Sequence, residues 1–148
     1  MSKVEGIVVP LLTPVNEREE VHYGQLEKLI DYVICGGVNG IFVNGTTGEF
    51  ARFSMADRQK IVRIAVEAAD GRVPVIAGVS ECGTRRVLEN VKAAEEAGAE
   101  AVVTTMPYYF PTSSVGEQIE FVRDVTGATK LPVLLYDIPS VIGFHLTE

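Results

Sequence analysis

Two glycines bracket two threonines in the stretch Gly45-Thr46-Thr47-Gly48-Glu49, which joins an apolar run to a segment with helical periodicity. Glycine allows a tight turn and lets a ligand approach the backbone closely. The hydroxyls and N–H groups of such a turn can hold a carboxylate or a phosphate. Because a strand-to-helix turn needs glycine anyway, this stretch alone does not separate a structural turn from a binding site.

Three tyrosines form the second group of residues that could do chemistry: Tyr108, Tyr109 and Tyr136. A phenol can move a proton when a neighbouring hydroxyl passes the charge along. Tyr136 continues an apolar run, so we expect its ring inside and its oxygen paired, with Thr46 or Thr47 as the partner. For Tyr108 and Tyr109, loop packing against the flanking prolines is the alternative.

The sequence offers few residues for catalysis by a histidine base, a metal ion or a cysteine thiol. His22 and His145 fall at a helix start and in the C-terminal tail, where surface positions are expected. No His, Cys, Asp and Glu residues have the spacing of metal ligands, so we expect no metal and no cofactor. Cys35 and Cys82 lie far apart and are expected to be reduced thiols, as in a cytoplasmic protein. Glu49 is expected to cap the following helical segment or to brace its loop.

Composition and charge narrow the classes of protein. The chain has 148 residues, of which 47% are hydrophobic and 22% charged, and a formal net charge of −7. These values are typical of a globular domain and argue against a nucleic-acid partner. No apolar run is long enough to cross a bilayer, and the N-terminal residues lack the pattern of a secretion signal.

The elements that must position the candidate residues alternate along the chain. Short, nearly continuous apolar runs, typical of buried parallel strands, occupy residues 6–12, 40–44, 73–79, 101–105 and 132–136. Segments with helical periodicity lie between them, at residues 22–35, 54–69, 84–97 and 115–125. Such alternation predicts either a doubly wound open sheet or a (β/α)₈ barrel.

The ends of the predicted strands favour the barrel, because nearly every one carries polar or unusual residues. They are Thr13-Pro14, the glycine–threonine turn, Ser80-Glu81, the segment 106–111 and Tyr136-Asp137. Chemistry collects at the carboxyl ends of many strands in a barrel, whereas an open sheet uses one switch point. A doubly wound nucleotide-binding domain would also need a glycine-rich turn where Thr13-Pro14 stands. We therefore predict one incomplete TIM-barrel domain over residues 1–148, the N-terminal part of a (β/α)₈ barrel with about five strands and four helices.

Several of these motifs, taken in order, resemble the dihydrodipicolinate synthase / N-acetylneuraminate lyase family. They are Thr13-Pro14, Gly45-Thr46-Thr47-Gly48-Glu49, the run 74–79, Gly98-Ala99, Pro107-Tyr108-Tyr109 and Tyr136-Asp137-Ile138-Pro139. The resemblance implies a TIM barrel that assembles as a homotetramer of tight dimers. It also implies a lysine Schiff base with pyruvate or a related 2-oxo acid, and a C–C bond made to or broken from an aldehyde.

The resemblance further implies roles for individual residues. Thr46 and Thr47, with Gly45, would bind the pyruvate carboxylate through hydroxyl and backbone N–H groups. Tyr136 would be the proton shuttle beside the imine. Tyr109 would complete a relay with Thr46 and Tyr136 by reaching into the site of a neighbouring subunit.

The sequence departs from the family pattern in three places. Val141 stands where the dihydrodipicolinate synthases have an arginine, and the segment 108–113 is one residue shorter than theirs. The shorter segment is closer to the neuraminate lyase and 2-keto-3-deoxy sugar acid aldolase branch. Both features argue against dihydrodipicolinate synthase itself, which is the alternative. The third departure is the nucleophilic lysine, expected after a sixth strand that this chain does not contain.

None of the lysines is expected to reach the mouth of the barrel. They are Lys3, Lys28, Lys60, Lys92 and Lys130. We therefore expect the chain to be the N-terminal portion of a longer lyase and to be inactive alone. A non-catalytic half-barrel that acts by self-association is the hypothesis from a different class.

Overall fold

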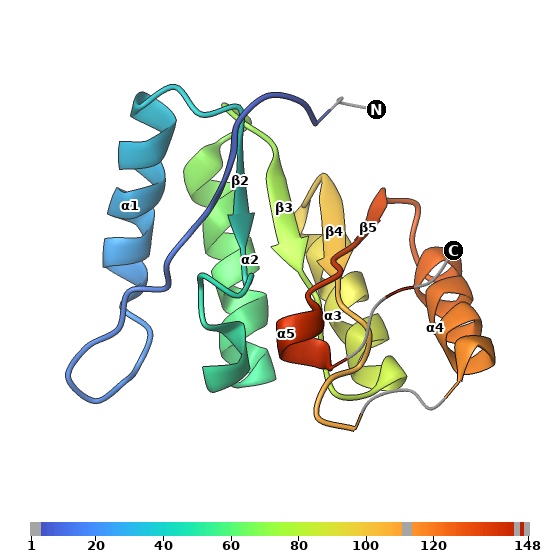
Figure 1. Cartoon of the computed structure of the whole chain (residues 1–148). Coiled ribbons are helices and arrows are strands. Elements are labelled where there is room, and N and C mark those ends of the chain that lie inside the picture. The colour runs from blue at the N-terminus through green and yellow to red at the C-terminus, as the bar shows by residue number, and fades with distance from the viewer. Residues whose placement is uncertain (1–3, 111–113, 144–145, 147–148) are drawn as a thin grey trace.

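Strands and helices alternate along the chain in the computed structural model, which describes residues 4–110, 114–143 and 146 (Figure 1). The strands are β1 (Val8–Pro10), β2 (Gly40–Val43), β3 (Val75–Gly78), β4 (Ala101–Thr104) and β5 (Val133–Leu135). The helices are α1 (Tyr23–Cys35), α2 (Met55–Ala69), α3 (Thr84–Ala97), α4 (Val115–Gly127) and α5 (Pro139–Ile142), with a 3₁₀ turn η1 (Phe50–Arg52). The five predicted strands and four predicted helices are confirmed. The sequence did not predict η1 or α5.

The sheet is parallel throughout, and its strands follow chain order, β1-β2-β3-β4-β5. A doubly wound sheet reverses direction at a switch point, and this sheet does not. Because each right-handed crossover advances the same way, the helices collect on one face. There α1 packs on α2, α2 on α3 and α3 on α4, as Figure 1 shows. The chain therefore forms successive units of a (β/α)₈ barrel.

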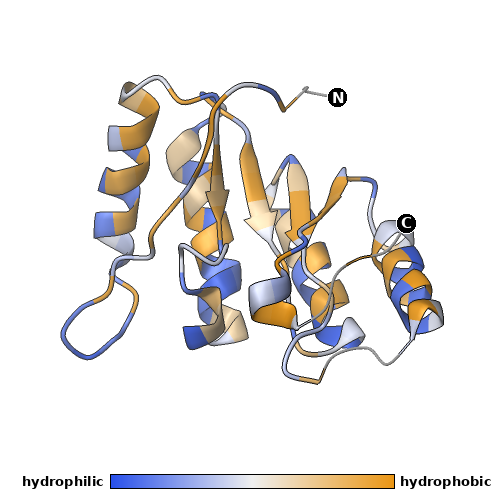
Figure 2. Cartoon of the chain, viewed as in Figure 1, coloured by the Kyte–Doolittle hydropathy of each residue, from blue (hydrophilic) through white to orange (hydrophobic). Residues whose placement is uncertain are grey.

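Strand residues alternate between two apolar layers. The layer facing the helices contains Ile41, Val43, Val75, Ala77 and Val102, packed against buried helix residues that include Leu26, Ile30, Ile61, Ala65, Val87 and Val91. The opposite face carries a smaller cluster of Ile76, Ala101 and Val103, with Val8 and Phe42 against it. The strands are accordingly apolar along their length, whereas the helices are mixed (Figure 2). This second face is the interior side of a barrel.

Local capping fixes where the helices begin and end. The Ser54 side chain accepts a hydrogen bond from the Asp57 N–H at the start of α2, as its spacing predicts. Ser114 caps α4 in the same way, by accepting from the Glu117 N–H. Gly98 ends α3 in the left-handed conformation that glycine favours, with φ of 90°. The helix layer is therefore set largely by local sequence.

Candidate active site

The carboxyl ends of the parallel strands meet at one edge of the sheet, and the glycine–threonine turn lies there after β2 (Figure 1). The Gly48 N–H donates to the Gly45 carbonyl at 3.1 Å, and the Glu49 N–H donates to the Thr46 carbonyl at 3.0 Å. A Cβ built on Gly45 would lie 2.6 Å from the Phe42 ring. The first glycine is therefore needed for close packing of the turn over β2.

The turn is also tied to the end of β1 and to the segment that follows it. The Thr13 hydroxyl donates to the Gly48 carbonyl at 2.8 Å, and a Cβ on Gly48 would lie 3.0 Å from the Leu11 carbonyl oxygen. The Glu49 carboxylate pairs with Arg52 at 2.7 Å, and its side chain makes no capping hydrogen bond to η1. Of its two predicted roles, Glu49 therefore braces the loop. These contacts hold the two threonines in a fixed place at the edge of the sheet.

A cavity of about 370 Å³ opens on the face of the sheet away from the helices. Its lining brings together Thr46 and Thr47 from the turn after β2 and Tyr136 from the end of β5. The rest of the lining is apolar and consists of Val4, Val8, Pro10, Phe42, Ile76, Val103, Leu134 and Leu135. Residues 90 positions apart in sequence therefore share one concave site with a few convergent hydroxyls, which is the usual composition of a small-molecule pocket.

The two threonines present groups suited to an anion. Both are exposed, and their backbone N–H groups donate to no acceptor within the described part of the chain. Free N–H groups beside hydroxyls at a turn form a concave binding site for a carboxylate or phosphate.

Tyr136 packs edge-on against Phe42, with ring centroids 6.5 Å apart. Its hydroxyl makes no direct hydrogen bond to either threonine among the described residues, so the three hydroxyls share the cavity without touching. An apolar wall holds the phenol at the rim, where a ligand placed between it and the turn would contact both.

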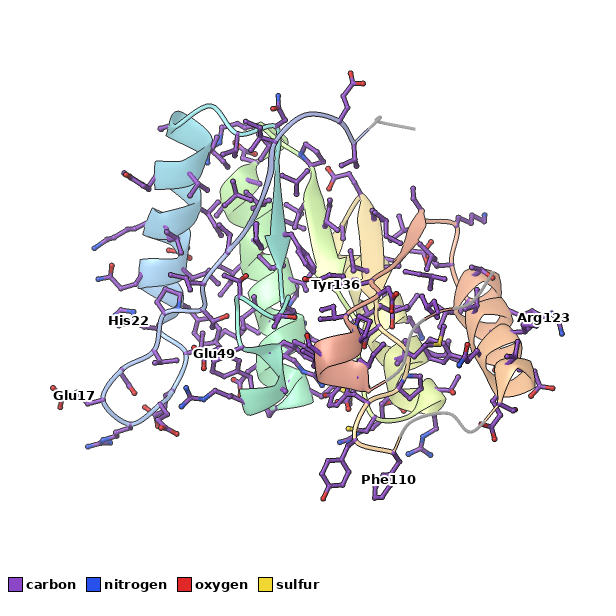
Figure 3. The ribbon with its side chains drawn as sticks, in the orientation of Figure 1. Glu17, His22, Glu49, Phe110, Arg123 and Tyr136 are labelled. Carbon is purple, nitrogen blue, oxygen red and sulfur yellow. The ribbon has the colours of Figure 1, made fainter. Side chains whose placement is uncertain are left out.

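Tyr109 does not line this cavity. Its side chain is 81% exposed and packs edge-on against Phe110, with ring centroids 4.8 Å apart. Figure 3 shows Phe110 at the lower edge of the molecule, in the loop after β4. The backbone of Tyr109 has φ of 71°, a conformation that is strained for a bulky residue. The structure therefore separates Tyr109 from the other candidate residues of the same chain.

Tyr108 belongs to the packed interior of the loops. Its ring meets the Phe50 ring edge-on at 5.6 Å, and the side chain is half-buried. The pKa of Tyr108 is raised to about 12, chiefly by burial and in smaller part by the nearby Cys82 and Glu81. A phenol kept neutral in this way fits the packing alternative that the sequence left open.

Arg58 is the main residue near the site that sequence reasoning missed. Arg58 is only 4% exposed. Its guanidinium donates a hydrogen bond to the Ser80 carbonyl at 3.0 Å and forms an ion pair with the Glu81 carboxylate. The available signal was its spacing, because Arg58 lies three and seven residues before the buried Ile61 and Ala65 of α2. A charged side chain on the apolar face of a helix indicates a buried ion pair.

No described lysine lines the cavity. Lys28, Lys60 and Lys92 lie on α1, α2 and α3, and Lys130 precedes β5 at the opposite edge. Lys3 falls outside the described residues. The expectation that none of these amines meets the cavity therefore holds for the lysines that the structure describes.

The histidines and acidic residues do not build an alternative centre. His22 accepts a hydrogen bond from the Gln25 N–H at 3.3 Å and caps α1 at the surface, while His145 lies outside the described residues. Within residues 4–110, 114–143 and 146, no group of three His, Cys, Asp or Glu residues could hold a metal ion. Over the same residues, no helix combines the length and apolarity needed to cross a membrane.

Fold and site together define part of a (β/α)₈ barrel with a cavity on its interior face that reaches the carboxyl ends of β2 and β5. The chain belongs to the Dihydrodipicolinate synthetase family, which it matches over residues 3–148. It is 35% identical over 146 residues to a 4-hydroxy-tetrahydrodipicolinate synthase of Phocaeicola vulgatus, which covers 99% of this chain and 49% of the relative. A synthase of the same name from Staphylococcus carnosus is 40% identical over 136 residues, which covers 92% of this chain and 46% of the relative.

Solved structures agree. YagE, a prophage protein of the dihydrodipicolinic acid synthase family from E. coli K12 solved in complex with pyruvate, superposes with a TM-score of 0.92 and 34% identity. That match covers 96% of this chain and 47% of YagE. The chain thus spans about half the length of the relatives it matches, and its fold is the N-terminal part of a TIM barrel.

Proposed function

We propose that this chain is part of a class I aldolase-type lyase that forms or cleaves a C–C bond to pyruvate or a related 2-oxo acid. The observation that carries the proposal is that Thr46, Thr47 and Tyr136 line the same cavity. Membership of a family of lyases and the pyruvate complex of YagE support the choice of ligand.

Each residue has a role that its position allows. The carboxylate of the 2-oxo acid binds the hydroxyls and free N–H groups of Thr46 and Thr47. Gly45 contributes to this binding by letting the turn pack closely against the Phe42 ring. The keto carbon then points along the cavity, where a lysine amine forms an imine that takes up electrons as the C–C bond breaks. Tyr136 moves the proton to or from the reacting groups. The scheme uses no metal and no cofactor.

In this proposal, the lysine that forms the imine belongs to a part of the enzyme outside this 148-residue chain. The described lysines lie on the helix layer or at the opposite edge, so the chain alone carries the carboxylate grip without the nucleophile. We expect it to be inactive by itself, because a missing nucleophile abolishes the imine step.

Val141 bears on the aldehyde partner. It lies on α5, directly after β5, and is 56% exposed. An apolar side chain at this place offers no charge to a second carboxylate, which favours a sugar-acid substrate of the neuraminate lyase and 2-keto-3-deoxy sugar acid aldolase type. The names of the relatives favour the alternative, 4-hydroxy-tetrahydrodipicolinate synthesis.

Tyr109 supports assembly with further copies. Its ring and that of Phe110 are 81% and 75% exposed, which is unusual for two adjacent aromatic side chains on a monomer. We propose that this pair meets a neighbouring subunit and that Tyr109 completes the relay there, in a homo-oligomer built from tight dimers.

The exposed free thiols of Cys35 and Cys82 suit a reducing, cytoplasmic setting.

Reductive trapping tests the function. The chain and a version extended through the next strand-and-helix unit are each incubated with pyruvate and borohydride, and their masses are measured. We expect no adduct on the 148-residue chain and one adduct on a new lysine of the extended version. An adduct on this chain would contradict the placement of the nucleophile. Absence of trapping in the extended version would favour the non-catalytic, self-associating half-barrel.

A further inference from the structure

Asn44 holds a special place beside the turn. It immediately precedes Gly45, is only 3% exposed and has φ of 57°. Its side-chain NH₂ donates to the backbone carbonyl of Arg58 at 2.9 Å. Because a carbonyl can only accept, the amide nitrogen must face Arg58, and the amide oxygen Oδ1 must face elsewhere.

The Arg58 guanidinium also has one nitrogen without a hydrogen-bond partner among the described residues. Its terminal nitrogens bond to the Ser80 carbonyl and the Glu81 carboxylate. The third nitrogen, Nε, is buried and has no hydrogen-bond partner among the described residues. The same is true of Asn44 Oδ1. One buried donor and one buried acceptor are therefore unpaired on two residues of the described part of the chain, although almost all buried polar groups in proteins are bonded.

Both residues line the same small cavity, between α2, α3 and the end of β3. Its volume is about 10 Å³, which is the space one water molecule needs. A water has the matching chemistry, since it can accept from Nε–H and donate to Oδ1 in the same position. Its second hydrogen has further polar neighbours in Gln59 and Asn90, which also line the cavity.

We propose that this cavity is a site for one internal water, which joins Arg58 to Asn44 and positions the glycine–threonine turn. The water completes a polar network that ties three strand ends together. Arg58 grips the residues after β3, and Ser80 Oγ accepts from the Thr105 N–H after β4 at 2.9 Å. Asn44 connects this network to the turn after β2, because it bonds to Arg58 and immediately precedes Gly45. Only the catalytic consequence of this positioning rests on the proposed function.

The first test uses the unmodified chain without any ligand. A high-resolution crystal structure is expected to show one ordered water within about 3.2 Å of both Arg58 Nε and Asn44 Oδ1. In solution, the Arg58 Nε–H proton is expected to show a cross-peak to a long-lived bound water. A cavity without a water, or an Arg58 Nε–H bonded to a protein group instead, would overturn the proposal.

The second test measures the turn itself through hydrogen exchange of the Gly48 and Glu49 amides, which close it. Asn44→Gly keeps the left-handed backbone and removes the side chain, so exchange should accelerate about tenfold at these amides. Asp70→Gly is the matched control, because Asp70 is an exposed left-handed residue at the end of α2, with φ of 47°. Equal exchange in the two variants would refute positioning.

Arg58→Lys separates the water from the ion pair. A lysine keeps a positive charge for Glu81 but has no group equivalent to Nε, so we expect the same local acceleration as in Asn44→Gly. Restoration of wild-type exchange by the lysine variant would show that charge alone holds the turn. Neither measurement involves pyruvate, so failure here is separate from failure of the proposed function. If a variant does not fold, the water measurement on the unmodified chain decides the matter.

Discussion

Gly78, the last residue of β3, should tolerate no side chain, and Gly78→Ala tests how the turn is held. A Cβ at this position would lie 2.1 Å from the carbonyl oxygen of Asn44 and 3.1 Å from that of Val43. Real Cβ atoms essentially never approach another heavy atom within 3.0 Å. Because the obstacle is backbone, no side-chain rotation can relieve it, and β3 must separate from the Asn44 peptide by about 1 Å.

The expected cost follows from two opposing effects. Overpacking of a well-packed interior costs about 1–3 kcal/mol, and a backbone clash in a sheet belongs at the upper end. Replacing a strand glycine by alanine recovers about 0.5–1 kcal/mol of conformational free energy. We therefore expect Gly78→Ala to lower the free energy of unfolding by about 2 kcal/mol.

Urea unfolding followed by circular dichroism measures this loss, with amide shifts of Thr46 and Thr47 as a local readout. Gly127→Ala is the matched control, because a Cβ there meets nothing within 4 Å and the residue is exposed at the end of α4. The control should be neutral or slightly stabilising. If Gly78→Ala unfolds within about 0.5 kcal/mol of wild type and leaves the turn shifts unchanged, the close approach of β3 to the turn is not a real constraint.

Three further outcomes are expected. Tyr23→Phe removes the hydroxyl that donates to Asp57 at 2.8 Å and should cost about 1 kcal/mol of unfolding free energy near neutral pH. Because burial raises the pKa of Tyr23 to about 12, the Tyr23 contribution should persist below pH 10 and disappear as the pH rises through 12. The Asp57 pKa is lowered, chiefly by its hydrogen bond with Ser54, so its contribution should disappear as the pH falls below 3.8. Glu81→Gln leaves a buried guanidinium without its counter-ion and should cost about 3 kcal/mol in urea unfolding. Tyr109→Ala should weaken self-association about tenfold in sedimentation equilibrium.

Wild type sets the baseline for the first of these outcomes, and matched variants set it for the other two. If the unfolding free energy of Tyr23→Phe depends on pH in the same way as that of wild type, the hydrogen bond between Tyr23 and Asp57 does not contribute to stability as proposed. Glu89→Gln, in an exposed pair with Arg85 at 3.6 Å, should change stability by less than about 0.5 kcal/mol. Tyr32→Ala removes a 77% exposed tyrosine from α1, and a loss of association as large as for Tyr109 would contradict an interface at the loop after β4.

The fold could be predicted because its elements are strongly marked in the sequence. Buried parallel strands are continuous apolar runs, and each long helix has a periodic stripe. The boundaries were less predictable, because a strand ends where its neighbours stop pairing. Thus the predicted run 73–79 is shortened to Val75–Gly78 by its register against β2 and β4. Helix α5 was missed because Pro139–Ile142 is too short to show a period.

The site was predictable where residue type alone implies a place. Two glycines around Thr46 and Thr47 require a turn. The expectation for Tyr136, a ring inside and an oxygen paired with Thr46 or Thr47, is not met among the described residues, because Tyr136 is 39% exposed and its ring packs edge-on against Phe42. Phe42 was missed because an apolar strand residue is expected in the core on either face. Arg58 was missed because a charged helix residue is expected at the surface. Its spacing on the apolar face of α2 indicated burial, but only three-dimensional packing shows its partners, Ser80 and Glu81.

The central claim is that the edge of the sheet binds the carboxylate of a 2-oxo acid, and an NMR titration of the chain with pyruvate tests it most directly. The account predicts saturable shifts at the amides of Thr46 and Thr47 and at the ring of Tyr136. Thr47→Val should weaken them, while Thr126→Val on α4 should not. Shifts that fall elsewhere, or that persist unchanged in Thr47→Val, would contradict the account.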